Sequence, residues 1–150
     1  DFDTFTPAVG LNRIENMKQI TVAAAIILNQ QQQILVVRKQ HTQCFMQVGG
    51  KLEAHETPEQ TMLREIAEEI GCHARISHFV GQFCTATANE PDHQLVSYVY
   101  HVQLQGEPKI DAEIAEMKWV NLSDQTTNLA PLTREIVMPW CVQQLTLCGI

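Results

Sequence analysis

The stretch Gly50–Cys72, which reads GKLEAHETPEQTMLREIAEEIGC, decides how this chain folds. Its middle predicts a helix that begins at Thr57, because a threonine N-cap, a proline in the first helical position and a glutamine at the third complete a capping box. Gly71 is expected to end this helix, because glycine readily adopts the left-handed conformation that follows the last helical turn. The apolar stripe expected to pack on a sheet consists of Met62, Leu63, Ile66, Ala67 and Ile70.

Three carboxylates gather on the other side of this predicted helix, at Glu65, Glu68 and Glu69. A run of charges is usually a solvated face, but such a face alternates its signs. Glu65 and Glu69 are instead like charges at the i,i+4 spacing, and only Arg64 can compensate, toward Glu68. Repelling carboxylates become favourable around a hard divalent cation. The helix therefore predicts a site for Mg²⁺, with Mn²⁺ as a substitute.

The spacing of this stretch resembles the Nudix box, G-x5-E-x7-R-E-U-x-E-E-x-G-U, where U is a bulky aliphatic residue. Every fixed position matches, and only Cys72 stands where an aliphatic side chain is usual. The resemblance implies the α/β class, as a Nudix-type α/β/α sandwich with a central mixed β-sheet and a loop–helix–loop motif that holds the cation.

The resemblance also implies roles for individual residues. Glu68 and Glu69 occupy the positions of the main metal ligands, with Glu65 as a further ligand or as the group that orients water. The backbone carbonyl of Gly49, just before the box glycine Gly50, is implied as another ligand.

A supporting layer around the cation is implied for Glu56, Arg64 and Gly50, with Glu56 and Arg64 bracing the loop against the helix. The ordinary alternative for that pair is a surface ion pair. A further acid is expected six residues before Trp119, at Glu113. Its rivals in the same loop are Glu116 and Asp111. The general base stays open between Glu65, Glu69 and Glu113.

The implied activity is Mg²⁺-dependent pyrophosphohydrolysis of a nucleoside diphosphate linked to another moiety, by attack of water on phosphorus. The segment FMQVGG at residues 45–50 and the short chain resemble small nucleoside-triphosphate pyrophosphohydrolases of this family. This resemblance implies nucleoside triphosphates, ribo or deoxy, cleaved to the monophosphate and pyrophosphate. In that segment, Val48 replaces a proline that is common before the two glycines. The alternatives are an ADP-ribose or nucleotide-sugar pyrophosphatase, a non-catalytic nucleotide-binding module and an RNA-decapping enzyme.

Candidate substrate contacts come from basic side chains, aromatic side chains and one asparagine on the strands and loops that flank the box. Two are basic residues for the outer phosphate, and four are candidates for the base. They are Arg38 and Lys51, then Phe45, Phe83, Asn89 and Tyr98. The ordinary alternatives are solubilising charges, core aromatics and loop residues.

The composition limits the partners. A formal charge of −7 over 150 residues, with a pI near 5.3, repels phosphate backbones and anionic lipid, so a small nucleotide is expected rather than long nucleic acid or a membrane. Five dispersed cysteines without a C-x-x-C pair predict a reduced, cytoplasmic protein without a disulfide framework or zinc site. A homodimer is a candidate state.

Around the box, the sequence predicts a single domain over residues 17–150, after an N-terminal extension or cloning remnant at residues 1–16. Ile20–Leu28 and Ile34–Val37 are expected to form a hairpin through the polar turn between them. A second helix is expected from Pro131 to Leu145. Further strands are expected at Arg75–Phe83, Leu95–Leu104 and Met117–Leu122.

Overall fold

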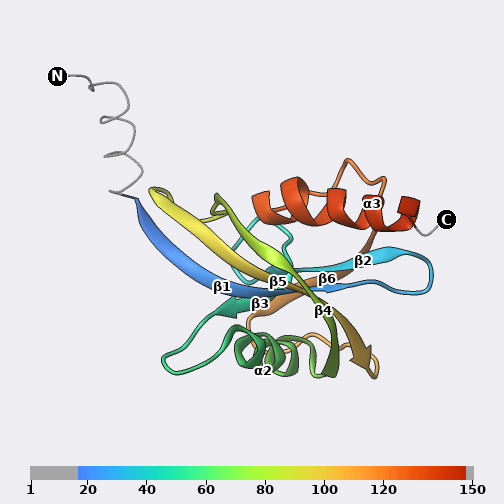
Figure 1. The fold of residues 1–150 in the computed structure, drawn as a ribbon, viewed down its shortest axis with the longest axis horizontal. Helices are drawn as coiled ribbons and strands as arrows, with labels where there is room; N and C mark the ends of the chain where they lie inside the picture. Colours follow the sequence, from blue (N-terminus) through green and yellow to red (C-terminus); the bar gives the residue numbers. More distant parts are fainter. Residues whose placement is uncertain (1–16, 148–150) are drawn as a thin grey trace.

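The computed structural model describes residues 17–147, in which two helical layers enclose two β-sheets (Figure 1). In chain order the elements are β1 (Lys18–Ile27), β2 (Gln33–Lys39), β3 (Val48–Lys51), α2 (Pro58–Ile70), β4 (His73–Ala86), β5 (His93–Gln105), β6 (Ile114–Asn121), the π-helical segment η1 (Thr133–Val137) and α3 (Met138–Leu147). The predicted extension at residues 1–16 lies outside this range.

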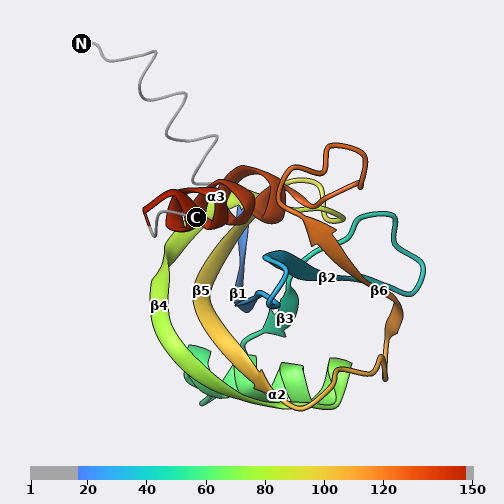
Figure 2. The ribbon, with the colours of Figure 1, turned by 90° about the vertical axis from the view of Figure 1, so that its right-hand side faces the viewer.

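The larger sheet has the order β3-β1-β5-β4, and the smaller sheet pairs β2 with β6. Strand β1 runs parallel to β5 and antiparallel to β3, while β4 is antiparallel to β5. Figure 2 shows α2 and α3 on opposite sides of these strands. The predicted α/β sandwich with a central mixed sheet is therefore confirmed. No helix within residues 17–147 is long and apolar enough to cross a membrane.

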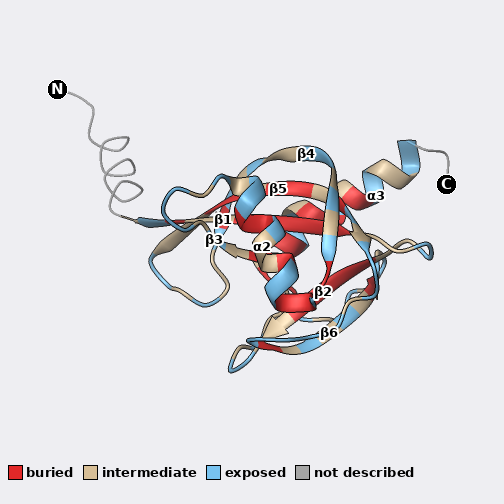
Figure 3. Ribbon diagram, turned by 90° about the horizontal axis from the view of Figure 1, so that it is seen from below, coloured by how far each residue is buried: buried red, intermediate tan, exposed pale blue. Residues whose placement is uncertain are grey.

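Strand β1 contributes side chains to two hydrophobic cores, one on each face of the sheet, because successive side chains of a strand point to opposite faces. Ala23, Ala25 and Ile27 pack in the core on the α2 side, whereas Ala24 and Ile26 pack in the core on the α3 side. Figure 3 shows the buried positions concentrated on the strands that lie between the helices. A strand buried on both faces gives one continuous apolar run, as this sequence has at β1.

Helix α2 begins and ends where the sequence predicts. The Gln60 N–H donates to the Thr57 hydroxyl at 3.1 Å, and the Thr57 N–H donates to the Gln60 side chain at 2.9 Å. The helix stops at Gly71, which has φ 65° and a left-handed conformation that glycine adopts without steric cost.

The predicted apolar stripe of α2 is wrong at two positions, because Leu63 and Ala67 are exposed. The centre of the buried face lies about 100–140° of rotation away from these two residues. It consists of Thr61, Met62, Ile66, Glu69 and Ile70. One of the three clustered carboxylates, that of Glu69, therefore faces the protein interior.

The predicted hairpin between β1 and β2 is also wrong as a strand pair. The polar turn is present, and its Asn29 side chain accepts hydrogen bonds from the N–H groups of Gln31 and Gln33. Only the Leu28–Ile34 bridge joins the two strands before β2 pairs with β6 instead. The reason is that β3 and β5 already occupy both edges of β1.

The remaining predicted elements are confirmed with longer bounds. Strands β4 and β5 include the strands predicted at residues 75–83 and 95–104, and β6 covers the strand predicted at residues 117–122 except for Leu122, which lies in the turn after it. Helical structure begins at Pro131, as expected, and continues to Leu147. The π-helical register of η1 within it was not predicted, and it places Thr133 and Val137 in the interior.

Candidate functional site

The two glycines at the start of the box let β3 lie tightly between β1 and α2. A Cβ on Gly49, which has φ 156°, would lie 2.9 Å from the Cα of Ala24 and would collide with the Ala23 carbonyl. A Cβ on Gly50 would collide with the carboxylate of Glu65. Close backbone approach therefore requires glycine at both positions, and it brings the β3 backbone against the acidic face of α2.

Glu69 is the most buried carboxylate of the cluster, with 3% of its surface exposed. One oxygen accepts the Gly49 N–H at 3.4 Å, and the other lies 3.7 Å from the Lys39 ammonium. Burial raises the pKa of Glu69 to about 8, against the opposing effect of Lys39. Burial also raises the pKa of Glu65, although Arg64 and Lys39 oppose the rise. The site thus holds two carboxyl groups whose negative charge is poorly stabilised without a further cation.

Arg64 ties the loop before α2 to the carboxylates on the helix. Its guanidinium donates to Glu56 through Nε at 2.7 Å and Nη2 at 3.0 Å, and its Nη1 lies 3.2 Å from both Glu65 and Glu68. Glu56 also accepts from the Thr61 hydroxyl at 2.7 Å. The hydrogen bonds from Arg64, then that from Thr61, lower the pKa of Glu56 to about 2. Glu56 and Arg64 therefore meet as a pair that joins loop and helix.

The acidic groups surround an open cavity of about 470 Å³, here called the carboxylate cavity. Its lining consists of Lys39, Gly50, Lys51, Leu52, Glu53, Arg64, Glu65, Glu68, Glu69, Ala112 and Glu113. Glu113 thus reaches the cavity from the loop before β6. Of the two rival acids, Glu116 pairs with Arg38 at 2.8 Å, and Asp111 accepts the Ala112 N–H at 2.7 Å.

The donor set fits a hard divalent cation. Between residues 17 and 147, no three His, Cys, Asp or Glu groups converge tightly enough to hold a metal as the side chains stand. Arg64 accounts for this in part, because it draws Glu65 and Glu68 toward itself. Mg²⁺ keeps several of its waters and needs only one or two direct carboxylates, so these oxygen donors suit it. The poorly stabilised negative charge on Glu65 and Glu69 also favours a bound cation at this place.

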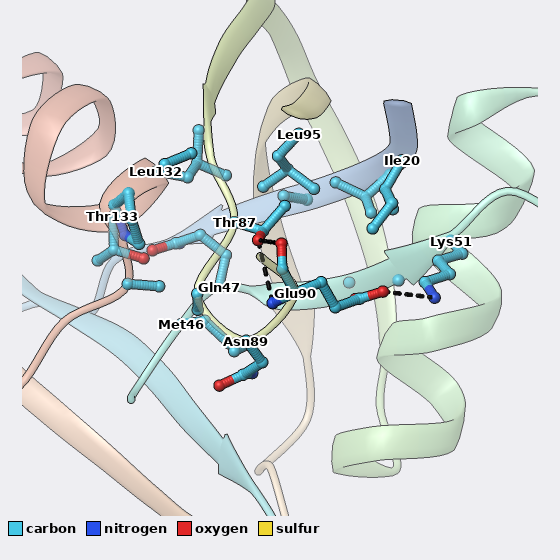
Figure 4. Close-up of a pocket in the computed structure, with 18 of the residues that line it drawn as sticks. Ile20, Met46, Gln47, Lys51, Thr87, Asn89, Glu90, Leu95, Leu132 and Thr133 are labelled. Atoms are coloured by element: carbon cyan, nitrogen blue, oxygen red, sulfur yellow. Dashed lines mark hydrogen bonds and ion pairs between the residues drawn. The ribbon is translucent and has the colours of Figure 1, made fainter. Parts of the chain in front are cut away.

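Figure 4 shows the lining of a second cavity of about 270 Å³, here called the apolar cavity. Its walls come mainly from apolar side chains of β1, β5 and the segment that leads into η1. They include Ile20, Val22, Leu95, Pro131 and Leu132. Lys39, Gly50 and Lys51 line both cavities, so the two spaces meet at these three residues. At this junction the Lys51 ammonium lies 3.8 Å from the Glu90 carboxylate.

The structure places only some of the predicted substrate contacts at these cavities. Lys51 and Asn89 line the apolar cavity. Phe45 and Phe83 pack against the core on the α3 side, and Tyr98 packs against the core on the α2 side. Arg38 lies with Glu116, and its Nη1 donates to the Thr42 carbonyl at 2.8 Å. The roles of all these residues stay predictions.

Lys39 is the residue that sequence reasoning missed. It is the last residue of β2, and it lines both cavities beside Glu69. In the sequence it is one of several scattered basic residues, far along the chain from α2. The only available signal was its place at the end of an apolar strand, where a side chain can reach a site at the sheet edge.

Curated relatives align with part of this chain. An 8-oxo-dGTP diphosphatase of Haemophilus influenzae is 48% identical over 58 residues, which cover 36% of this chain and 43% of that protein. An 8-oxo-dGTP diphosphatase of Escherichia coli is 39% identical over 59 residues, covering 37% and 46%. A Bacillus subtilis relative is 29% identical over 99 residues, covering 66% and 64%. The chain thus spans less than two thirds of the length of these relatives.

Solved structures share the fold over most of the chain. The solution structure of the Escherichia coli ORF135 protein matches with a TM-score of 0.67 and 25% identity, covering 88% of this chain and 94% of that one. A UDP-X diphosphatase matches with a TM-score of 0.70 and 24% identity, covering 95% and 72%. A family model for the NUDIX domain matches residues 17–141, which include the whole box and both cavities' β-strands. This chain therefore belongs to the NUDIX domain family.

Proposed function

We propose that this protein is a Mg²⁺-dependent pyrophosphohydrolase that uses water to cleave a nucleoside diphosphate linked to another moiety. The favoured substrates are nucleoside triphosphates, ribo or deoxy, which with one water give the nucleoside monophosphate and pyrophosphate. The observation that carries the proposal is the meeting of the two cavities at Lys39, Gly50 and Lys51. In the proposed complex, the base would occupy the apolar cavity and the phosphates would extend toward the carboxylates.

The residues that would hold the cation are Glu65, Glu68, Glu69 and the carbonyl of Gly49. When bound there, Mg²⁺ would supply positive charge for the phosphoryl oxygens and lower the pKa of a bound water. The need for it follows from charge, because a polyphosphate and a protein of net charge −7 repel each other. Lys39, between the cavities and 3.7 Å from Glu69, adds a fixed positive charge where the phosphates would pass.

The other polar residues hold this arrangement in place. The bidentate contact of Arg64 with Glu56 fixes the loop, and the remaining guanidinium N–H groups orient Glu65 and Glu68. The proton of the attacking water would go to a carboxylate of the cavity, for which Glu65, Glu69 and Glu113 are the candidates. A Glu113→Gln variant tests Glu113 against the other two, because loss of the base lowers kcat and removes the acid limb of the pH profile of kcat.

The relatives support the triphosphate assignment over the alternatives. The Haemophilus influenzae and Escherichia coli relatives carry the name 8-oxo-dGTP diphosphatase, a reaction on a nucleoside triphosphate. One structural neighbour is a UDP-X diphosphatase, which supports nucleotide sugars as the second candidate class. Glu65, Glu68 and Glu69 are all present, which speaks against a non-catalytic module.

The test is a substrate panel with Mg²⁺, in which nucleoside triphosphates, ADP-ribose, nucleotide sugars and dinucleoside polyphosphates are compared by product analysis. Turnover in ¹⁸O-labelled water locates the attacked phosphorus. Glu69→Gln is expected to abolish turnover, whereas Glu135→Gln, an exposed partner of Arg134, serves as the control and keeps it. Equal turnover by Glu69→Gln and wild type would remove Glu69 from the mechanism. No turnover of any substrate would refute the enzyme assignment.

A further inference from the structure

The end of the apolar cavity beside η1 contains two buried polar groups that the fold leaves without partners. In the part of the chain that the structure describes, three buried side-chain atoms lack a hydrogen-bond partner: the oxygens Gln47 Oε1, Ser97 Oγ and Thr133 Oγ1. Gln47 is 5% exposed and Thr133 is fully buried, and both line the apolar cavity. Two of the three orphaned groups therefore belong to the wall of one cavity.

The Gln47 atom without a hydrogen-bond partner is its side-chain oxygen, because the side-chain amide nitrogen donates to the Ala25 carbonyl at 2.8 Å. That bond fixes which end of the amide faces away from β1, and the remaining oxygen can only accept a hydrogen bond. The hydroxyl of Thr133 can both donate and accept. Together the pair offers one obligate acceptor beside one adaptable group.

The pair lies on the side of the apolar cavity away from Lys51, one of the three residues at the junction with the carboxylate cavity. In Figure 4 the Gln47 side chain extends toward Thr133, while Lys51, one of the residues shared by both cavities, lies on the other side. The walls between them are mainly apolar, from residues such as Ile20 and Leu95. A nucleotide with its phosphates at the junction would therefore direct the far edge of its base at Gln47 and Thr133.

We propose that Gln47 and Thr133 are specificity-determining residues that select a nucleobase with an exocyclic amino group. The amino N–H would donate to Gln47 Oε1, and the Thr133 hydroxyl would donate to the ring nitrogen or carbonyl beside that amino group. The physical reason is the cost of leaving buried polar atoms unpaired, which a ligand with the complementary edge removes and a ligand without it does not. The proposal rests on the nucleotide assignment made above.

The fold itself gives a second reason to look for a ligand at Thr133. A buried hydroxyl without a partner destabilises a protein relative to an isosteric methyl group. Thr133 also opens the π-helical segment η1, and short π-helical turns occur frequently at functional sites. A Thr133→Val variant is therefore expected to be at least as stable as wild type and to lose only the recognition of the base.

The experiment compares nucleotides in matched pairs that differ by one amino group: guanosine with inosine, adenosine with purine riboside, and cytidine with the pyrimidin-2-one nucleoside. The ratio of kcat/KM is measured for the triphosphates, and the ratio of Kd is measured by calorimetry for the monophosphates. Wild type is expected to favour the amino member of at least one pair by about tenfold or more. Thr133→Val and Gln47→Met are expected to bring that ratio near one.

Ser97→Ala is the matched control, because Ser97 carries the other unpartnered hydroxyl but does not line the apolar cavity. It should leave the ratio unchanged. If Gln47→Met fails to fold because the Ala25 carbonyl loses its partner, Thr133→Val decides alone.

Two results would overturn the proposal. One is a wild-type ratio near one in all three pairs. The other is a Thr133→Val protein that keeps the wild-type ratio, and a fall in its Tm would then identify the hydroxyl as structural. If no triphosphate is hydrolysed, the proposed activity fails, while the Kd ratios still decide whether this pair recognises the base.

Discussion

Replacing Glu69 with glutamine should stabilise the metal-free protein at high pH. The carboxyl is 3% exposed, and burial raises its pKa from 4.5 to about 8. The folded state therefore holds this proton more tightly than the unfolded state, so the free energy of unfolding falls as pH rises from 4.5 to 8. The loss attributable to Glu69 between pH 5 and pH 8 is about 3 kcal/mol.

Glu69→Gln keeps the shape of the side chain and an oxygen that can accept the Gly49 N–H. It should match wild type near pH 5 and exceed it by about 3 kcal/mol at pH 8, equivalent to a rise in Tm of roughly 5–10 °C for a domain of this size. The measurement is urea unfolding with a chelator present, at several values of pH. The difference between the two curves reports the charge of Glu69 together with its effect on Glu65, because these two carboxyl groups influence each other's titration.

Adding Mg²⁺ should make wild type more stable than Glu69→Gln at pH 8. A cation that binds the folded carboxylate stabilises wild type at pH 8 by mass action, and it should do so far less for Glu69→Gln. Glu68→Gln is the matched control for the metal-free experiment, since its side chain is 53% exposed on the same helix. A wild-type stability that does not fall from pH 5 to pH 8, or a Glu69→Gln protein less stable than wild type at pH 8, would refute the reasoning.

Three further predictions concern the core, the junction of the two cavities and strand β3. Met62→Ala should lower the free energy of unfolding by about 2–5 kcal/mol in urea titrations, because the side chain is fully buried under the sheet; a loss under 1 kcal/mol would contradict its place in the core. Lys39→Met should lower kcat/KM for nucleoside triphosphates on the order of tenfold by removing the cation shared by the two cavities, and unchanged kinetics would exclude Lys39 from phosphate binding. Gly50→Ala should weaken Mg²⁺ binding in calorimetry, because its Cβ would displace the Glu65 carboxylate; wild-type affinity would show that Glu65 is not a ligand.

The local features of α2 could be predicted because they depend on neighbours in the sequence. The Thr57 cap and the Gly71 stop are set by backbone hydrogen bonds within a few residues. The predicted buried stripe was wrong at Leu63 and Ala67. The pattern of apolar residues fixes the direction of the buried face only to within about 100°, which is the rotation from one helical residue to the next. The sheet it packs against decided the final angle, and that choice placed Glu69 in the interior.

The pairing of strands could not be predicted from local pattern. An apolar run, a polar turn and a second apolar run describe a hairpin, and the turn at Asn29 did form. Which strand lies beside β1 depends on β3 and β5, whose competition for its edges involves residues far apart in the chain. The contact between Lys39 and Glu69 could not be predicted for the same reason, because the two residues are far apart in the sequence. Lys39 reaches Glu69 only when β2 has paired with β6.

The amino-acid sequence by itself determined the loop–helix motif, the cluster of three glutamates and the family to which the chain belongs, because fixed spacing along one helix turns directly into positions in space. Tertiary structure alone decided which carboxylate is buried, which loop acid faces the cluster and where the apolar cavity lies. The burial of Glu69 depends on how α2 packs against the sheet, the place of Glu113 depends on the loop before β6, and the apolar cavity depends on β1, β5 and the segment that leads into η1. Burial and electrostatic environment are properties of packed surfaces, and no single segment of the chain contains them.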